Sequence, residues 1–181
     1  KDDKVLTDWN GLMISAFSQS AKALNQEKYL KIAQKAADFC LSELRQKNGR
    51  LLKRWRRGKA GLPAHLEDYA FLSQGLLDLY EASFKVKYLQ AAIELVDLTR
   101  KHFEDTENGG FFLTADDGEK LLIRAKEIYD GAIPSGNSVM ALNLLRVHKI
   151  TGQEKYQSSA ENLFSAFSGF LEKSPQGAEV L

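Results

Sequence analysis

Acidic, amide and aromatic side chains gather at three places in the chain, each just ahead of an apolar stretch. The three groups are Asp8, Trp9 and Asn10; Glu67, Asp68 and Tyr69; and Asp130, Ser135 and Asn137. Carboxylates and amides hydrogen-bond the hydroxyls of a sugar or polyol, and an aromatic ring offers a surface for stacking. Two carboxyls about 5 Å apart would suit retaining glycoside hydrolysis, and about 6.5 to 9.5 Å would suit the inverting reaction. Glu67, Asp68 and Asp130 are therefore candidate acid–base residues, and the other six are candidate binding residues.

The same residue types have a structural interpretation. Asp8, Ser135 and Asn137 are typical helix N-caps, and Glu67 and Asp68 would complement the positive end of a helix dipole. Because a sequence gives no distance between the three groups, both interpretations stay open.

A basic run at residues 53–59 is the second feature that could bind a ligand. It holds five cations in seven residues around Trp55. A charged ribbon edge, protected from pairing with another strand, is the favoured interpretation. Arg54 and Trp55 are also candidates for contact with an anionic or sugar ligand, and the cations could pair with the carboxylates above. Nucleic-acid binding is not favoured, since the expected helices carry no second basic patch.

Other chemistries find little support. His65, His102 and His148 are too scattered for a metal motif, and His65 is the only histidine we consider as an acid or base. The sequence contains no phosphate-binding loop, dinucleotide fingerprint or nucleophile elbow. Its single cysteine, Cys40, is expected to be inert packing. We therefore expect no metal and no cofactor.

The elements that must position these residues are helical. Residues 12–17, 70–80 and 139–147 are apolar on most faces, which predicts buried inner helices. After a short polar link, each is followed by an amphipathic outer helix that starts with a lysine–tyrosine pair at residues 28–29, 87–88 and 155–156. Glycine-bounded apolar runs at 49–56 and 109–124 predict β-ribbons between these units. The fold class is all-α: a partial (α/α) toroid of about three helical hairpins with short β-ribbons. Since the hairpins repeat in one sense, the inner helices should start at one common end.

Composition limits the alternatives further. The chain has 181 residues, 44% hydrophobic, with 25 basic and 24 acidic side chains, which excludes disorder and favours one domain over residues 1–181. No apolar window is long enough for a membrane span, and the first residues lack the core of a signal peptide, so a cytoplasmic location is predicted. The absence of an initial Met and the apolar last residues favour a piece of a longer protein.

Four ordered motifs carry a resemblance to a known family. They are LTDWNGL at 6–12, LEDYAFL at 66–72, GGFF at 109–112 and DGAIPSGNS at 130–138. Together they resemble the C-terminal part of the thioredoxin-domain-containing family of spermatogenesis-associated protein 20. The resemblance implies an N-terminal thioredoxin-like domain, absent from this chain. It also implies a six-hairpin toroid similar to N-acylglucosamine 2-epimerases and six-hairpin glycosidases, of which this chain is roughly half.

Two functional hypotheses follow. The first is a carbohydrate-binding or carbohydrate-processing toroid whose ligand, a small sugar or polyol, sits where the inner helices start; an enzyme activity would be glycosidase- or epimerase-like. The second is a non-catalytic scaffold that supports the missing thioredoxin-like domain. In either case the open edges of a half toroid expose apolar surface, which predicts self-association.

Overall fold

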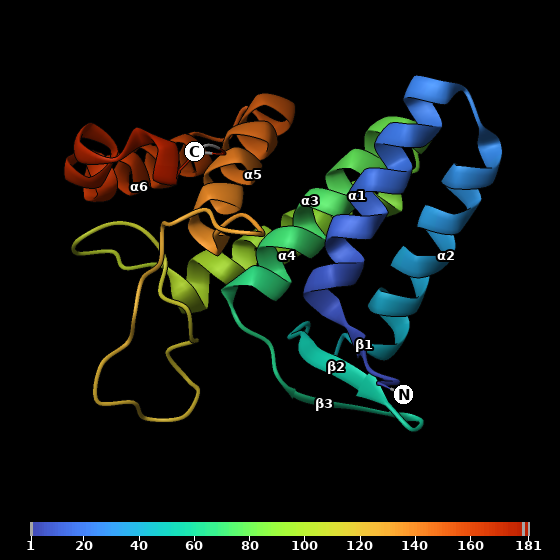
Figure 1. Ribbon diagram of the computed structural model, residues 1–181, viewed down its shortest axis with the longest axis horizontal. Coiled ribbons are helices and arrows are strands. Elements are labelled where there is room, and N and C mark those ends of the chain that lie inside the picture. The colour runs from blue at the N-terminus through green and yellow to red at the C-terminus, as the bar shows by residue number, and fades with distance from the viewer. Residues whose placement is uncertain (1, 179, 181) are drawn as a thin grey trace.

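The computed structural model describes residues 2–178 and 180, and it consists mainly of six helices (Figure 1). The elements in chain order are β1 (Val5–Leu6), α1 (Thr7–Leu24), α2 (Glu27–Glu43), β2 (Leu52–Arg56), β3 (Lys59–Pro63), α3 (Leu66–Ser83), α4 (Val86–Phe103), α5 (Gly136–Thr151), α6 (Glu154–Lys173) and the 3₁₀ turn η1 (Pro175–Gly177). No helix in this part of the chain is long and apolar enough to cross a lipid bilayer.

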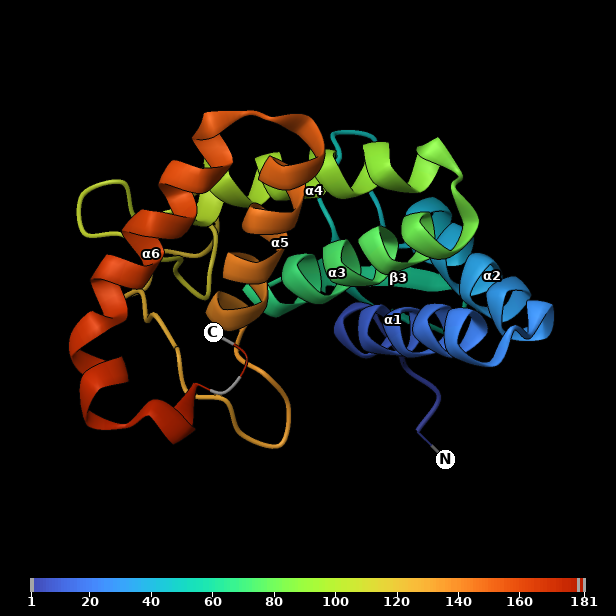
Figure 2. The same ribbon diagram turned by 90° about the horizontal axis from the view of Figure 1, so that it is seen from above.

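The helices pair into three antiparallel hairpins, as the sequence predicts. Figure 2 shows α1, α3 and α5 on the inside of an arc, with α2, α4 and α6 around its outer side. The links between the paired helices are short because a residue in the left-handed conformation ends each inner helix. These residues are Asn25, Phe84 and Gly152. The arc is a partial (α/α) toroid.

Burial separates inner from outer helices. Twelve of the 18 residues of α3 are buried, whereas α2 buries only three of its 17, all on one stripe. Cys40 lies on that stripe, fully buried, and burial raises the pKa of its thiol to about 12. The inner helix α1 exposes Trp9, Met13 and Leu24, since no further inner helix covers it among the described residues. The apolar core therefore centres on α3.

The helices α1 and α3 touch backbone to backbone at two glycines. A methyl group at Gly11 would lie 2.5 Å from the amide nitrogen of Leu72, and one at Gly75 would lie 2.5 Å from the carbonyl oxygen of Gly11. Both separations are far below van der Waals contact, so only glycine fits at this crossing. This contact fixes how the two helix starts lie relative to each other.

Only the first of the two predicted β-ribbons forms. Strands β2 and β3 are antiparallel, with Arg54 opposite Gly61, and β1 pairs with the other edge of β2. The prediction of a second ribbon over 109–124 is wrong: that segment has one isolated bridge, between Glu104 and Phe111, and is otherwise irregular. Side chains replace the partner strand there. Asn137 bonds both the N–H and the C=O of Phe111, and the Arg124 guanidinium donates to the carbonyl of Thr114.

Candidate functional site

The first turns of the three inner helices meet at one end of the arc. The backbone N–H of Asp8 donates to Asp68 Oδ1 at 3.2 Å, which joins the start of α1 to that of α3. A methyl group at Gly136, the first residue of α5, would lie 2.8 Å from Leu66 Cγ on α3. Here we call the polar group at the starts of α1 and α3 the mouth. It consists of Asp8, Trp9, Lys53, His65, Glu67 and Asp68.

Asp68 organises the mouth from a fully buried position. Besides the Asp8 N–H, its carboxylate accepts the backbone N–H of His65 at 2.8 Å and lies 3.4 Å from Lys53 Nζ. The His65 bond forms part of the capping box that starts α3. Burial raises the pKa of Asp68 to about 7, against the lowering effect of Lys53 and the His65 N–H. This acid is therefore poised to change its charge near neutral pH.

Lys53 is the cation that the two aspartates share. It comes from β2, and its ammonium lies 3.5 Å from Asp8 Oδ2 as well as 3.4 Å from Asp68 Oδ2. Burial lowers the pKa of Lys53, but the charges of Asp68 and Asp8 outweigh burial and raise it overall, so the ammonium stays protonated. Of the alternatives that the sequence leaves open for the basic run, Lys53 shows pairing with the carboxylates.

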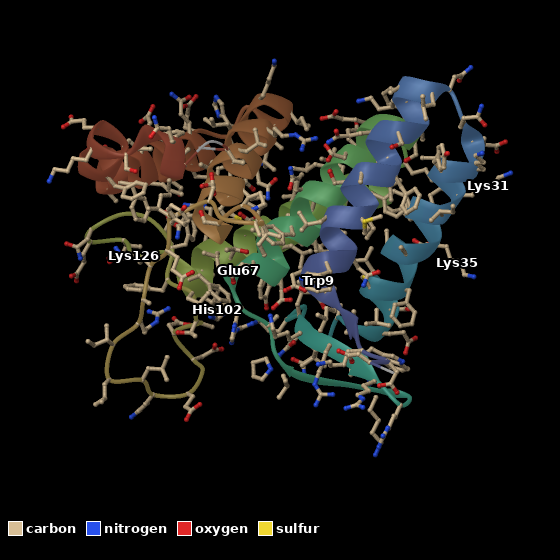
Figure 3. The ribbon with its side chains drawn as sticks, in the orientation of Figure 1. Trp9, Lys31, Lys35, Glu67, His102 and Lys126 are labelled. Atoms are coloured by element: carbon tan, nitrogen blue, oxygen red, sulfur yellow. The ribbon has the colours of Figure 1, made fainter. Side chains whose placement is uncertain are left out.

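Glu67 and Trp9 are the side chains at the mouth that are left without such partners. Glu67 is half-buried and makes no hydrogen bond to another described residue. Burial raises the pKa of its carboxyl, against the lowering effect of its own backbone N–H and of the Lys53 charge, and the charges of Glu127 and Asp8 add to the rise. Trp9 is 61% exposed, and Figure 3 shows it with Glu67 at the starts of neighbouring helices. Burial, followed by the charge of Lys53, lowers the pKa of His65, which favours its neutral form.

Several other candidate residues make contacts that serve the fold. The Asn10 amide donates to the carbonyl of Leu6. The Tyr69 hydroxyl is buried and accepts from Leu51 N and Arg50 Nε. Trp55 packs edge-on against Phe39, with ring centroids 5.7 Å apart. Arg54 follows Lys53 on β2, so the alternation of a strand turns it to the opposite face of the ribbon.

The third candidate group also has its polar atoms engaged. Ser135 caps α5 by accepting from the N–H of Ser138. Asp130 accepts backbone N–H groups from Ser135 and Val180. Asn137 is fully buried and bonds Phe111 and the carbonyl of Glu127. These three residues shape the irregular segment before α5, so the side chains that are free to meet a ligand come from α1 and α3.

A cavity of about 630 Å³ opens beside the mouth, between the β2–β3 ribbon and residues 114–121. Lys53 and His65 belong to both, and Arg50, Leu62 and Leu121 are among the other lining residues. The sequence offers one signal for Lys53. Successive side chains of a strand point to opposite faces, so Lys53 and Arg54 of the basic run cannot both face the mouth. Nothing in the sequence marks Arg50 as a lining residue, because its position depends on its contact with Asp117 in a loop far along the chain.

Among residues 2–178 and 180, one group of side chains could geometrically hold a metal ion. His102, Asp116 and Asp117 bring their ligand atoms within 4.8 Å of one another. The guanidinium of Arg50, however, donates to Asp117 Oδ2 at 2.7 Å, and His102 Nδ1 lies 2.9 Å from Asp116 Oδ1. The carboxylates are already paired with nitrogen groups, so we assign no metal to them.

A second ionic cluster, which the sequence analysis missed, joins the same three inner helices in their C-terminal halves. Arg146 on α5 donates to Asp78 Oδ1 and Glu81 Oε1 on α3, both at 2.7 Å. From α1, Ser15 bonds Asp78 at 2.5 Å and Lys22 lies 3.3 Å from Glu81. The only signal was an acidic residue, Asp78, within the apolar stretch of α3.

Comparisons with known proteins agree with this architecture. No protein-family model matches the chain. The chain is 39% identical over 184 residues to human spermatogenesis-associated protein 20, which covers 96% of this chain and 23% of the human protein. It is 34% identical over 182 residues to an uncharacterized protein of Caenorhabditis elegans, with 96% of this chain and 25% of that protein covered. The chain thus spans about a quarter of the length of these relatives.

Solved structures with a similar fold are carbohydrate enzymes. A family 76 α-mannanase of Bacteroides thetaiotaomicron superposes with a TM-score of 0.73 at 22% identity, over 92% of this chain and 45% of the mannanase. The cellobiose 2-epimerase of Spirochaeta thermophila gives 0.73 at 17% identity, over 91% and 43%. These likenesses establish the fold. The sequence relatives go further: over the segment that it shares with them, the chain is similar in sequence to spermatogenesis-associated protein 20.

Proposed function

We propose that the mouth binds a small hydroxylated ligand of the carbohydrate class, and that the chain is part of a carbohydrate-binding or carbohydrate-processing toroid. The observation that carries this proposal is the Glu67 carboxyl, which has a raised pKa and no side-chain partner among the described residues, on the helix start next to that of the exposed Trp9. A carboxyl and an open indole ring are the usual partners of a sugar's hydroxyls and of its apolar face.

Two features of the structural relatives support this proposal. Both similar structures above act on carbohydrates by name, as does a D-mannose isomerase with a TM-score of 0.69 at 17% identity, over 88% of this chain and 39% of that protein. An α-1,6-mannanase of similar fold, from a Salegentibacter species, is described as inactive when two consecutive aspartates are replaced by asparagine. Glu67 and Asp68 are likewise consecutive acids, at the start of α3.

The mouth residues take different roles in this proposal. Glu67 is the group for direct contact: a carboxyl with a raised pKa can donate or accept a hydrogen bond, or act as a general acid. Trp9 supplies the stacking surface. Asp68 is a positioning residue, because it is fully buried and holds Lys53 and the Asp8 backbone in place. Asp130 is left out, since its carboxylate is engaged within its own loop and by Val180.

The test is a binding titration with a panel of mono- and disaccharides. Tryptophan fluorescence and ligand-observed NMR are its readouts. Only two tryptophans report, and Trp55 is packed against Phe39. We expect a saturable signal that Trp9→Phe removes and that Glu67→Gln weakens about tenfold, the size of one charged hydrogen bond. Glu43→Gln, an exposed acid on α2, is the matched control and should leave binding unchanged.

The scaffold hypothesis is favoured by a different observation. Asp68, Tyr69, Ser135 and Asn137 are all buried and internally bonded, as expected of residues that hold helix starts together. Under this hypothesis no sugar of the panel binds, and Asp68→Asn changes only the free energy of unfolding. That pair of results would replace the ligand-binding proposal.

A further inference from the structure

The cations in the wall of the cavity beside the mouth are already paired with acids. The Arg50 guanidinium donates to Asp117 Oδ2 at 2.7 Å and to the Tyr69 hydroxyl at 3.1 Å. The Lys53 ammonium lies 3.4 Å from Asp68 Oδ2. Each of these two lining cations therefore has a carboxylate of its own chain as its partner. An anionic ligand would have to displace one of these carboxylates before it could pair with either cation.

The other titratable groups of the wall also disfavour an anion. Burial, followed by the charge of Lys53, lowers the pKa of His65, so that its imidazole is neutral at pH 7. Glu119 lies exposed in the wall and forms no ion pair with another described residue. Its negative charge repels a carboxylate or phosphate that approaches the cavity. The electrostatics of the wall therefore suit an uncharged ligand.

Apolar side chains from both sides of the cavity supply much of the remaining wall. Leu52, Leu62 and Pro63 come from the β2–β3 ribbon, and Ala115 and Leu121 come from the irregular segment before α5. Leu62 is 53% exposed and Leu121 is 47% exposed. Open apolar surface thus borders the cavity on both of its sides, where an apolar group could cover it.

Leu62 of β3 holds a backbone conformation that leucine rarely adopts. Its φ is 64°, in the left-handed region, where the Cβ atom crowds the main chain. Glycine would adopt this conformation freely. Because about half of the leucine side chain is open to solvent, burial in the core does not offset the strain. Strained residues of this kind cluster at sites that clamp a ligand, which indicates that the Leu62 side chain serves the cavity.

The size and place of the cavity connect it with the mouth. Its volume of about 630 Å³ lies within the range of about 300–1,000 Å³ that is usual for pockets of small organic ligands. Lys53 and His65 belong both to the mouth and to the cavity wall. A single ligand can therefore occupy both, with its polar part at the mouth and its apolar part between Leu62 and Leu121.

We propose that the cavity binds an uncharged apolar group carried by the hydroxylated ligand of the mouth, so that the ligand is an aryl or alkyl glycoside. Leu62 and Leu121 contact the apolar group, and Lys53 and His65 lie at the boundary between it and the sugar. This inference rests on the proposed function, because it requires the mouth to bind the sugar.

The experiment compares two glycosides of one sugar, methyl and phenyl α-D-mannopyranoside, by isothermal titration calorimetry. We expect the Kd of the phenyl glycoside to be about tenfold lower, since its ring leaves water for the apolar wall. The 4-carboxyphenyl analogue should lose this gain, because the cations of the wall are already paired. A carboxylate that instead tightens binding would overturn the assignment of an uncharged group.

Substitutions in the wall should act on the phenyl group alone. Leu62→Gly and Leu121→Ser should each raise the Kd of the phenyl glycoside severalfold and leave that of the methyl glycoside unchanged. Leu62→Gly is expected to fold, because glycine suits the left-handed backbone at this position. Leu122→Ser is the matched control: Leu122 is fully exposed next to Leu121 but lies outside the cavity wall, so neither Kd should change.

The ratio of the two Kd values separates this inference from the proposed function. Glu67→Gln should weaken both glycosides alike and leave the ratio unchanged, whereas Leu62→Gly and Leu121→Ser should bring the ratio towards one. If the methyl glycoside binds and the wild-type ratio is one, or if neither leucine substitution changes the ratio, this inference fails and the proposed function stands. If neither glycoside binds, both fail.

Discussion

The two ends of the inner helices carry ionic clusters that differ in their balance of charge. In the C-terminal halves, Asp78 and Glu81 are matched by two cations, Arg146 and Lys22. At the mouth there are three acids and one lysine, which pairs with Asp8 and Asp68 only, and the nearby histidine has a lowered pKa. The balanced cluster satisfies its own charges and ties three helices together. The unbalanced one holds two acids, Glu67 and Asp68, whose pKa values are raised, which is typical of sites that bind or react.

Breaking the balanced cluster is expected to cost the most stability. Arg146→Met leaves Asp78, which is buried, without its cation and removes the ionic link between α5 and α3. We expect the free energy of unfolding in urea to fall by about 3 kcal/mol. Lys149→Met, an exposed lysine on the same helix, should change it by less than about 0.5 kcal/mol. Equal losses in the two variants would mean that the cluster does not hold the helices together.

The mouth should make the free energy of unfolding depend on pH, through Asp68. The pKa of Asp68 is about 7 in the folded chain and its ordinary value is 3.8, so between these values the folded state holds a proton that the unfolded state has released. The stabilisation from this proton is complete below pH 3.8 and is lost as the pH rises to 7.

We therefore expect the stability of the wild type, relative to Asp68→Asn, to fall by a few kcal/mol between pH 4 and pH 7 and then to level off. Chemical denaturation at four or five pH values measures it. A relative stability that instead rises with pH would show that Lys53 and the two N–H donors dominate over burial.

The smallest effect is expected at Glu67. Because burial disfavours its charged form, Glu67→Gln should leave the protein equally stable or stabilise it by up to about 1 kcal/mol at pH 7. Its counterpart in the balanced cluster, Glu81→Gln, should destabilise, since it loses charged bonds to Arg146 and Lys22. Opposite signs for the two substitutions would sharpen the contrast between the clusters, whereas a clear loss at Glu67 would remove it.

The hairpins could be read from the sequence because helical periodicity is local. Burial on all sides marks α3, and a single stripe marks α2, within a window of one helix. The second ribbon could not be read correctly. Its apolar run resembles a strand, but Asn137 satisfies the Phe111 backbone from 26 residues away, and no local pattern reports such a contact.

The sequence predicted that the helix starts gather at the mouth. It did not predict which of the acidic side chains there is buried and which is open to a ligand. Glu67 and Asp68 are adjacent in sequence, yet Asp68 is fully buried and meets three donors, while Glu67 bonds to no other residue in the part of the chain that the structure describes. Successive residues of a helix point about 100° apart, so which of two neighbouring acids turns inward depends on the packing of α3 against α1. That packing is a tertiary property.

The glycine crossing of α1 and α3 has a consequence for experiments on the mouth. Since Gly11 and Gly75 bring main chain against main chain, the spacing of the two first turns is set by atoms that no side-chain substitution at the mouth removes. The side chains of the mouth therefore do not set the distance between α1 and α3. Trp9, Glu67 and Lys53 can be substituted in combination while this helix contact is kept. Gly11→Ala should have the opposite effect: it should push α1 and α3 apart while all the mouth residues stay unchanged.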